Sequence, residues 1–396
     1  MIRPTLAMLT LFAMPIFANG IPGLEPENNW DLDGYVKYMA NVTLADNNQN
    51  ITEHLIHQRF NFEYRFNDHL RFNSSLRNRL ILGESTDIPG YADVIDTDTG
   101  YVDLSGNWLD KSGAIGNSQI DRLSLSWADE QWQVRGGRFR INWAMATLWN
   151  ANDIFNSYSI YDFDYEERAG TDALMVSHTL GYASNIDIVY APNSNRDLDS
   201  YSARYLFNHD LWDMQLLLGK SLSDRVIGAG FAGDIAGAGA RGEVTFFDPI
   251  WETIPGQSQS SSVQKRTWVA SLETDYTFNS SSNWAARAAI LYISELQDIN
   301  SGLHYLNMPL TPKTLSFAHW TYYADVGVDL TPLSRLTFAA SYYQDGSYFV
   351  SATNSYSLAN DWELLAVVQR FDGIKEESLF DSSAATQIFG RIKWSF

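Results

Sequence analysis

Apolar and polar side chains alternate along most of this chain, and the clearest stretch runs from residue 55 to residue 82. Ile56, Phe60 and Phe62 fall on one face of a strand, whereas Arg59 and Asn61 fall on the other. A period of two predicts β-strands that have one apolar and one polar face. Such strands suit a soluble β-sandwich or a transmembrane β-barrel, and alternation alone does not separate the two architectures.

The lengths of the connections separate them. Alternate connections are short, such as Asn67-Asp68 and Thr331-Pro332, and the long ones all fall at the other end of the strands: 83–117, 142–170, 249–264, 295–314 and 372–384. Short turns at one end and long loops at the other are typical of outer-membrane barrels. We therefore predict an all-β fold, an antiparallel transmembrane β-barrel of about 18 strands, with about 16 as the alternative. The predicted strands are 32–44, 53–66, 69–82, 118–129, 131–141, 171–181, 184–192, 200–208, 210–222, 225–234, 238–248, 265–278, 283–294, 315–330, 333–345, 347–358, 361–371 and 385–396.

The N-terminal residues predict export from the cytoplasm. Arg3 precedes a mostly apolar stretch, 6–17, which ends at the small residue Ala18. This is the layout of a secretory signal peptide, and an ordinary buried helix is the alternative. We predict a signal peptide at 1–18 and a single β-barrel domain at 19–396, located in the outer membrane of a Gram-negative bacterium.

Composition excludes several other classes of protein. The chain has no cysteine, so it holds neither a disulfide scaffold nor a cysteine metal site. Its 14% aromatic content disfavours disorder, and no apolar run beyond the N-terminus is long enough for a membrane-spanning helix. A formal net charge of -20 disfavours binding to nucleic acid.

The final predicted strand carries a second mark of the outer membrane. Phe396, Trp394 and Ile392 fall on one face of that strand, and Ser395 and Lys393 fall on the other. An alternating strand that closes on phenylalanine resembles the C-terminal assembly signature of bacterial outer-membrane barrels. Trp394 and Phe396 are therefore the expected assembly signal, with the outer-membrane assembly machinery as partner. An amphipathic edge strand of a soluble protein is the alternative.

Nine arginines gather in the second to fifth predicted strands and mostly alternate to the polar face. They are Arg59, Arg65, Arg71, Arg77, Arg79, Arg122, Arg135, Arg138 and Arg140. Because neighbouring strands of a meander lie side by side, we expect a basic ladder on one lumen wall. Charged walls of this kind set pore selectivity, so the ladder would line a solute path. A set of salt bridges that fills the lumen is the alternative.

The segment 142–170 is too apolar for a free surface loop, since it includes Trp143, Trp149 and Tyr161. We expect it to fold inward as a constriction loop whose carboxylates face the arginine wall, creating a transverse field that orients polar solutes. An extracellular lid is the alternative. The acidic residues concerned are Asp153, Asp162, Asp164, Glu166 and Glu167.

A block of residues around this segment resembles porin-like outer-membrane proteins, and the alginate-export type of eighteen-stranded channel is the family compared. The residues are Gly137-Arg138, Ile141, Trp143, Asn150, Asp153, Phe155-Asn156, Glu166-Glu167-Arg168, Gly170 and Asp172. The resemblance implies a channel with an arginine-rich lumen, which in that family conducts an acidic polysaccharide. This chain departs from the family in its overall acidity and acidic loop, so only the class of protein is carried over, not the substrate.

Other patterns predict no metal, no cofactor and no enzyme. His54 and His57 point to opposite faces of a strand. The carboxylates Asp93, Asp96, Asp98 and Asp103 lack a calcium-loop spacing, so a solvated acidic loop is favoured over a calcium site. The six glycines between Gly228 and Gly242 suit bends or close packing rather than a phosphate loop. No G-x-S-x-G stretch is present.

Two functions follow from the sequence. The first is an outer-membrane channel for passive diffusion of small hydrophilic solutes, anions among them, because the inner faces are polar and arginine-lined. The second is a non-channel barrel with a plugged lumen: a lipid or ester hydrolase, or a structural or assembly protein. The expected partners are outer-membrane lipid and lipopolysaccharide, the assembly machinery and a small solute, with no nucleic acid. The solute and the oligomeric state stay open.

Overall fold

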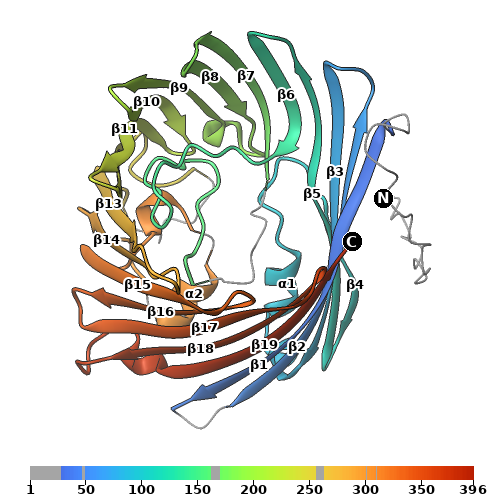
Figure 1. Ribbon diagram of the computed structural model, residues 1–396, viewed down its shortest axis with the longest axis vertical. Coiled ribbons are helices and arrows are strands. Elements are labelled where there is room, and N and C mark those ends of the chain that lie inside the picture. The colour runs from blue at the N-terminus through green and yellow to red at the C-terminus, as the bar shows by residue number, and fades with distance from the viewer. Residues whose placement is uncertain (1–27, 47–49, 162–169, 256–262, 300, 309) are drawn as a thin grey trace.

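The computed structural model describes residues 28–46, 50–161, 170–255, 263–299, 301–308 and 310–396. The predicted signal peptide at 1–18 lies outside these residues. Within them the chain forms one antiparallel meander that returns upon itself as a ring of strands (Figure 1).

The strands follow the predicted ones closely. They are β1 (Trp30–Ala45), β2 (Ile51–Arg65), β3 (Leu70–Gly83), β4 (Ser105–Lys111), β5 (Ala114–Ala128), β6 (Trp132–Phe139), β7 (Thr171–Gly181), β8 (Ser184–Ala191), β9 (Ser200–His209), β10 (Trp212–Ser221), β11 (Asp224–Ile235), β12 (Ala238–Pro249), β13 (Thr267–Thr277), β14 (Ala285–Ile293), β15 (Trp320–Thr331), β16 (Ser334–Tyr343), β17 (Ser347–Ala359), β18 (Trp362–Gly373) and β19 (Ala385–Ser395). Short helical segments lie between some of them: η1 (Glu84–Asp87), α1 (Tyr91–Asp96), η2 (Arg196–Leu198), α2 (Gly302–Asn307), η3 (Pro312–Thr314) and η4 (Asp381–Ser383).

Eighteen of these strands close the barrel, which confirms the predicted fold. Each pairs with its sequence neighbours, and β19 pairs with β1 to complete the ring. The exception is β4, which lies inside the long connection 84–113. The alternation predicted this connection but not the short strand within it. It pairs with the first part of β5, whereas β6 pairs with the last part, so β4 occupies the place beside β5 that the short β6 leaves empty.

The two faces of the wall differ as the alternation predicts. Large apolar side chains are exposed on the outward face, which is the face that contacts lipid in a transmembrane β-barrel. They include Leu216, Leu218, Ile227, Trp268, Leu272, Tyr322, Val350, Leu364, Val368 and Ile388. The alternate positions point inward and are buried, among them Gln215, Glu243, Thr245, Glu273, Thr321 and Gln369.

Tryptophans mark the ends of strands at the short-turn side of the barrel. Trp127 and Trp132 flank the turn between β5 and β6, and Trp362 and Trp394 stack with ring centroids 6.2 Å apart. Tryptophan favours the membrane interface because its ring is apolar and its N–H stays hydrated. The outward face therefore has an apolar belt and an aromatic border.

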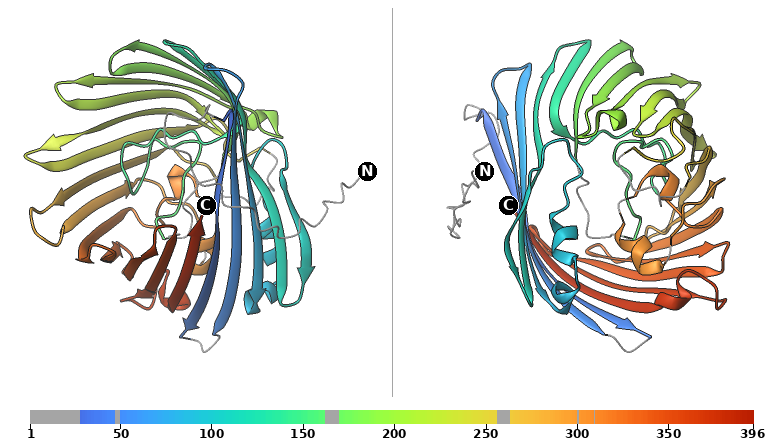
Figure 2. Two further views of the ribbon diagram at one scale, coloured as in Figure 1. Left: turned by 45° about the vertical axis from the view of Figure 1, so that its right-hand side comes forward. Right: turned by 180° about the vertical axis from the view of Figure 1, so that it is seen from behind.

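Several long connections fold onto the inner wall. Arg79 of β3 donates a hydrogen bond to the carbonyl of Ile95 in α1 (2.9 Å), and Tyr91 of the same helix donates to Glu53 of β2 (3.1 Å). Figure 2 shows that the strands of the wall are inclined to the barrel axis and surround these inner segments. Among the described residues, no helix has the length and apolar character needed to cross a bilayer.

Candidate functional site in the barrel lumen

The described part of the predicted constriction loop, 142–161, packs on the inner face of the barrel (Figure 1). Glu243 of β12 is its first anchor. The carboxylate accepts hydrogen bonds from the backbone N–H groups of Met145, Ala146 (2.8 Å) and Asn152 (2.9 Å). One buried carboxylate therefore satisfies three amides of a segment that lacks regular secondary structure.

Glu273 of β13 is the second anchor. It accepts hydrogen bonds from the backbone N–H groups of Thr147 (2.9 Å) and Leu148 (3.0 Å), and its other oxygen accepts from the Thr147 hydroxyl (2.6 Å). Arg287 of β14 also donates to the Thr147 hydroxyl (2.8 Å). These contacts hold the segment against β12–β14.

Glycines on the wall make room for the segment. A Cβ at Gly228 would lie 2.7 Å from Oδ1 of Asn152, and one at Gly230 would lie 2.8 Å from its Nδ2 and 3.0 Å from the sulfur of Met145. The Asn152 amide uses this space to donate to the Ala229 carbonyl (3.0 Å). Gly228 and Gly230, the first two of the six glycines between residues 228 and 242, are therefore explained by close packing against Asn152 and Met145.

Two apolar clusters fill the space between the segment and the wall. In the first, Trp143, Leu148, Trp149 and Ile154 pack against the inward residues Leu217, Val226, Phe247, Val269, Leu291 and Ile293. In the second, Tyr161 packs with Tyr305, Phe317, Tyr343, Phe349, Phe371 and Phe380. Burial raises the pKa of the Tyr161 hydroxyl to about 12. The segment thus runs from the wall of β10–β14 to that of β16–β18.

The predicted acidic partners of the ladder are only partly described. Asp153 has no exposed surface and lies within the packed segment, so its carboxylate does not face the lumen. Asp162, Asp164, Glu166 and Glu167 lie outside the described residues.

Four of the nine ladder arginines are held by other groups of the protein. Arg59 and Asp121 are both buried and joined by two hydrogen bonds of 2.6 and 3.0 Å. Arg65 pairs with Asp31 and with Glu63 (2.9 Å). Arg77 donates to Gln119, and Arg79 donates to Asn117 (3.0 Å) as well as to α1. Arg59 and Arg65 therefore fit the salt-bridge alternative, whereas Arg77 and Arg79 donate these hydrogen bonds to neutral groups.

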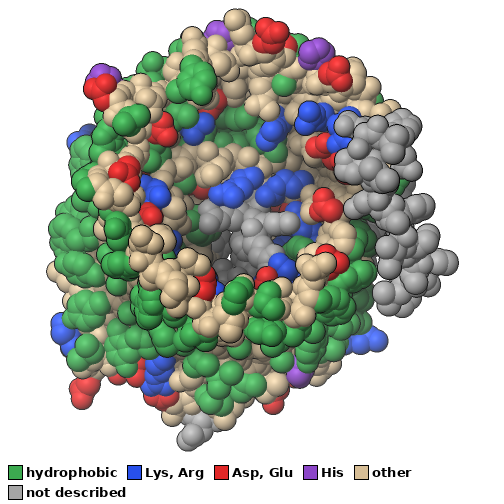
Figure 3. All heavy atoms as spheres, viewed as in Figure 1, with side chains coloured by type: hydrophobic (Ala, Val, Ile, Leu, Met, Phe, Trp, Pro, Cys, Tyr) green, Lys and Arg blue, Asp and Glu red, His purple; other side chains and the backbone are tan. Residues whose placement is uncertain are grey.

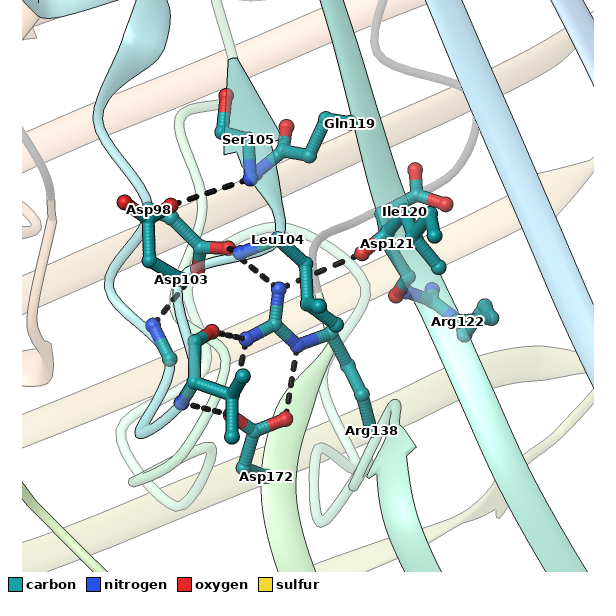
Figure 4. Close-up of polar contacts among 12 residues, drawn as sticks. Asp98, Asp103, Leu104, Ser105, Gln119, Ile120, Asp121, Arg122, Arg138 and Asp172 are labelled. Atoms are coloured by element: carbon teal, nitrogen blue, oxygen red, sulfur yellow. Dashed lines mark hydrogen bonds and ion pairs between the residues drawn. The ribbon is translucent and has the colours of Figure 1, made fainter. Parts of the chain in front are cut away.

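Arg138 is also held, at the centre of a buried cluster (Figure 4). Its guanidinium donates to Asp98 (2.6 Å) and makes two hydrogen bonds of 2.8 Å to Asp172. It also donates to the carbonyl of Val102 (2.5 Å). Gly137, just before it in β6, adopts φ 112°, a backbone conformation that favours glycine. Arg138 therefore fastens the connection between α1 and β4 to the barrel.

The remaining four arginines surround one cavity on the inner wall of β3, β5 and β6. Arg71, Arg122, Arg135 and Arg140 line a space of about 540 Å³ together with Ser75, Ser124, Ser126, Asn73 and Phe139, and with the carboxylates Glu63 and Asp68. Arg71 and Arg135 both lie beside Ser126 in the strand register, one on each side of β5. The Arg135 guanidinium lies 5.2 Å from the ring centre of Phe139.

These cations differ from Arg138 in their partners. In the part of the chain that the structure describes, Arg71, Arg135 and Arg140 make no ion pair with a carboxylate. Figure 3 shows basic side chains on the wall of the central hollow. An arginine without a carboxylate partner keeps its N–H donors for an anion.

The carboxylates of the acidic connection before β4 accept hydrogen bonds from other groups of the chain. Asp98 accepts hydrogen bonds from the backbone N–H groups of Gly100 and Leu104 (both 2.8 Å), and Asp96 accepts from the hydroxyl of Ser105 (2.9 Å). Among the described residues, no group of three or more His, Cys, Asp or Glu side chains is arranged to hold a metal ion.

The predicted assembly signal lies where the barrel closes. Trp394 is opposite Val36 in the register of β1 and β19, and its ring centroid lies 5.2 Å from that of Phe396. The Phe396 ring contacts Phe60 of β2, with centroids 5.9 Å apart. Both signal residues belong to the outward face of the closing seam.

Sequence reasoning missed Glu243 and Glu273, although a signal was present. Each is an acidic residue at an inward position in the middle of a predicted strand. A carboxylate placed there needs buried donors, and the amides of an inward-folding loop supply them.

No protein-family model matches this chain, and no curated protein matches it. Solved structures do. OccK8 (OprE) of Pseudomonas aeruginosa is 9% identical, with a TM-score of 0.58 over 93% of this chain and 98% of its own. OccAB2 of Acinetobacter baumannii is 8% identical, with a TM-score of 0.56 over 93% and 98%. OccD3 (OpdP) of Pseudomonas aeruginosa is 9% identical, with a TM-score of 0.52 over 92% and 91%.

Identities this low establish the fold and nothing finer. The chain has the porin-like fold of a closed outer-membrane β-barrel, as predicted. Together with the apolar belt, this fold points to the bacterial outer membrane. The alginate-export comparison stays a prediction.

Proposed function

We propose that this chain is an outer-membrane channel for passive diffusion of small hydrophilic solutes, with a preference for anions. The observation that carries the proposal is the cavity on the inner wall lined by Arg71, Arg122, Arg135 and Arg140. Among the described residues, Arg71, Arg135 and Arg140 make no ion pair with a carboxylate, and cations of this kind raise the local concentration of anions and steer them along the wall. The similar barrels from Pseudomonas and Acinetobacter agree with a role as a channel.

We also propose that the segment 142–161 acts as the constriction. It is anchored on β12 and β13, whereas the arginine cavity lies on β3, β5 and β6. A solute that passes between the two would travel along the basic wall. The chain would carry out no covalent chemistry on that solute and would need no cofactor.

The test is conductance of the purified full chain in planar lipid bilayers. We expect open-channel current and, in a KCl gradient, a reversal potential that indicates anion preference. Arg71→Gln combined with Arg135→Gln should move the reversal potential toward zero, because two cations leave the cavity. A bilayer that stays sealed at all voltages would refute the channel.

The matched control is Arg370→Gln. Arg370 lies opposite Val350 on the outward face and is held by Asp46 and Asp372, so it cannot touch a solute in the lumen. Its substitution should leave the reversal potential unchanged. If Arg370→Gln shifts the potential as far as the combined Arg71→Gln and Arg135→Gln variant does, the cavity is not the source of selectivity.

The two apolar clusters inside the barrel favour a second candidate, a plugged barrel that acts as a hydrolase or a structural protein. In that case the wild-type chain would not conduct, and Glu243→Ala, which releases the segment, would not open it.

A further inference from the structure

A row of cationic and aromatic side chains crosses the outward face of the barrel at the loop end of β9–β13. Strand register places Tyr201 beside Lys220, Lys220 beside Arg225, and Arg225 beside Asp248. Arg266, just before β13, donates to the far side of Asp248 (2.7 Å). The outward row is thus Tyr201, Lys220, Arg225, Asp248 and Arg266.

The row belongs to the outward face because its neighbours along each strand do. Leu218 and Leu216 precede Lys220 at alternate positions, and Ile227 follows Arg225 in the same way; all three are exposed. The residues between them, such as Leu217 and Val226, are buried inside the barrel. Each cation of the row therefore lies two positions along the chain from an exposed apolar residue of the belt, on the loop side of that residue.

The row carries three cations and one carboxylate in a chain whose net charge is -20. The side chains of Arg225 and Arg266 are 68% and 76% exposed, and both point to Asp248, which holds them together at 3.3 and 2.7 Å. Asp197 and Asp199 interact electrostatically with Lys220, so the positive charge that the row offers comes from Arg225 and Arg266, which share one carboxylate. That charge attracts anions from the surroundings of the protein.

Lys220 and two aromatic rings form the other half of the site. The Lys220 ammonium donates to the carbonyls of Asp197 (2.8 Å) and Asp199 (2.5 Å) in the connection before β9. It lies 6.0 Å from the ring centre of Tyr201 and 5.6 Å from that of Trp251. The Asp199 carboxylate accepts hydrogen bonds from the Tyr190 hydroxyl and from the backbone N–H of Asn193, and it is close enough to interact electrostatically with Lys220.

A cavity of about 570 Å³ joins these groups on the outside of the wall. Its lining combines Lys220 and Arg225 with Tyr201, Leu218, Ile250 and Trp251. Leu218 lies on the belt side of Lys220 and Arg225, and Ile250 and Trp251 border the cavity from the connection that follows β12. This order matches a ligand with an anionic head and hydrocarbon chains, oriented as it would be in the outer leaflet of a bilayer.

We propose that this outward row is a binding site for a phosphorylated glycolipid of the outer leaflet. Arg225 and Arg266 take its phosphate groups through charge-assisted hydrogen bonds, and the buried Lys220 holds the connection before β9 beside them. The acyl chains lie over Leu218, Ile227 and Trp268. Because the site is on the outer surface, the proposal is independent of whether the lumen conducts.

Another outward arginine shows what distinguishes the site. Arg370 stands at the same loop end of β18, but Asp46 and Asp372 both pair with it at 2.7 and 2.6 Å. One cation between two carboxylates has no net positive charge to offer a phosphate. The excess of cations, rather than the presence of arginine, marks the row.

Native mass spectrometry of the full chain in detergent micelles tests the proposal. The probes are bisphosphorylated lipid A and the same lipid with both phosphates removed. We expect the wild type to bind the phosphorylated form about tenfold more tightly. Arg225→Gln combined with Arg266→Gln should lose about that factor for the phosphorylated lipid and nothing for the dephosphorylated one. Both arginines are largely exposed, so the variant should fold, and the gel shift of the unheated barrel checks this.

The control variant combines Arg335→Gln with Arg370→Gln, which removes the same charge far from the row. It should bind both lipids as the wild type does. The proposal is overturned if the Arg225/Arg266 variant keeps wild-type affinity, if the control loses as much affinity, or if the wild type binds the two lipids equally.

Discussion

Phe396 and Gly34 exchange two backbone hydrogen bonds, each 3.0 Å long, one from the amide of either residue to the carbonyl of the other. The pair lies at the short-turn end of the seam between β1 and β19. Gly34 leaves room for this approach, because a Cβ there would touch the Phe396 ring at 3.0 Å as well as overlap the Arg59 carbonyl. The residue predicted as an assembly signal therefore completes the ring of strands.

Deletion of Phe396 should weaken closure of the barrel. It removes both backbone hydrogen bonds and the ring contact with Phe60, and we expect a loss of about 1–3 kcal/mol in the free energy of unfolding. The melting temperature of the refolded barrel and the fraction that runs as folded protein on an unheated gel measure the effect. Phe396→Tyr keeps the ring and the backbone and should behave as the wild type. Equal melting temperatures for the deletion and the wild type would show that the seam does not depend on this residue.

Glu243→Ala should release the segment 142–161 from the wall. Three backbone amides lose their acceptor, and we expect a cost of about 3 kcal/mol in the free energy of unfolding. Glu243→Gln keeps one carbonyl oxygen and should fall between the wild type and the alanine variant. Hydrogen exchange at Ala146 and Asn152 should accelerate in the same order. Unchanged exchange in Glu243→Ala would contradict the anchoring role.

Gly230→Val should push the same segment away from its wall. The added side chain would enter the space of Asn152 and Met145, at a cost of about 1–3 kcal/mol for overpacking. Chymotrypsin should then cleave after Trp143 or Trp149, which are buried in the native barrel. Gly390→Val is the matched control, because nothing lies within 4 Å of a Cβ at Gly390. Cleavage of both variants at the same rate would show that the space beside Gly230 is not needed to keep the segment 142–161 on the wall.

Arg138→Ala should unfasten the connection between α1 and β4. Asp98 and Asp172 would remain largely buried without their cation, and removal of one partner from a buried pair costs about 3–5 kcal/mol. Thermal unfolding measures this loss. Adding Asp172→Ala to Arg138→Ala should recover part of it, since one uncompensated carboxylate is then gone. A double variant that is less stable than Arg138→Ala alone would contradict this account.

The contact of Asp46 with Arg370 should depend on pH at the acidic end. The Arg370 guanidinium donates two hydrogen bonds of 2.7 Å to the Asp46 carboxylate and lowers its pKa below the usual 3.8. A carboxyl group whose pKa is lower in the folded state stabilises that state above its unfolded pKa, and the stabilisation is lost as pH falls through the folded pKa. The difference in melting temperature between the wild type and Arg370→Gln should be constant from pH 7 to about 5 and shrink below about 4.

Salt should reduce this difference, because Asp46 is exposed and exposed ion pairs are screened. A difference that grows as pH falls, or that ignores 1 M salt, would contradict the proposed cause.

Strand number and strand direction were readable from the sequence because both are local properties. Alternation with a period of two identifies each membrane-crossing strand, and turn length tells which end of it faces which side. All eighteen barrel strands were predicted, including β8 and β11. The strand β4 was missed because its pairing with β5 depends on where β6 ends, which alternation does not reveal.

Only the tertiary structure decided which side chains act together. Nine arginines looked alike in the sequence, yet Arg138 is held by Asp98 and Asp172, whereas Arg135, three residues earlier, lines the cavity with Arg71. The anchor Glu243 is 91 residues from Asn152, whose amide it binds. The outward row draws Lys220 and Arg225 from separate strands and Arg266 from the connection before β13. A periodic pattern tells which face of the wall a side chain takes, but its partners come from strand register and loop path, which depend on contacts between residues distant along the chain.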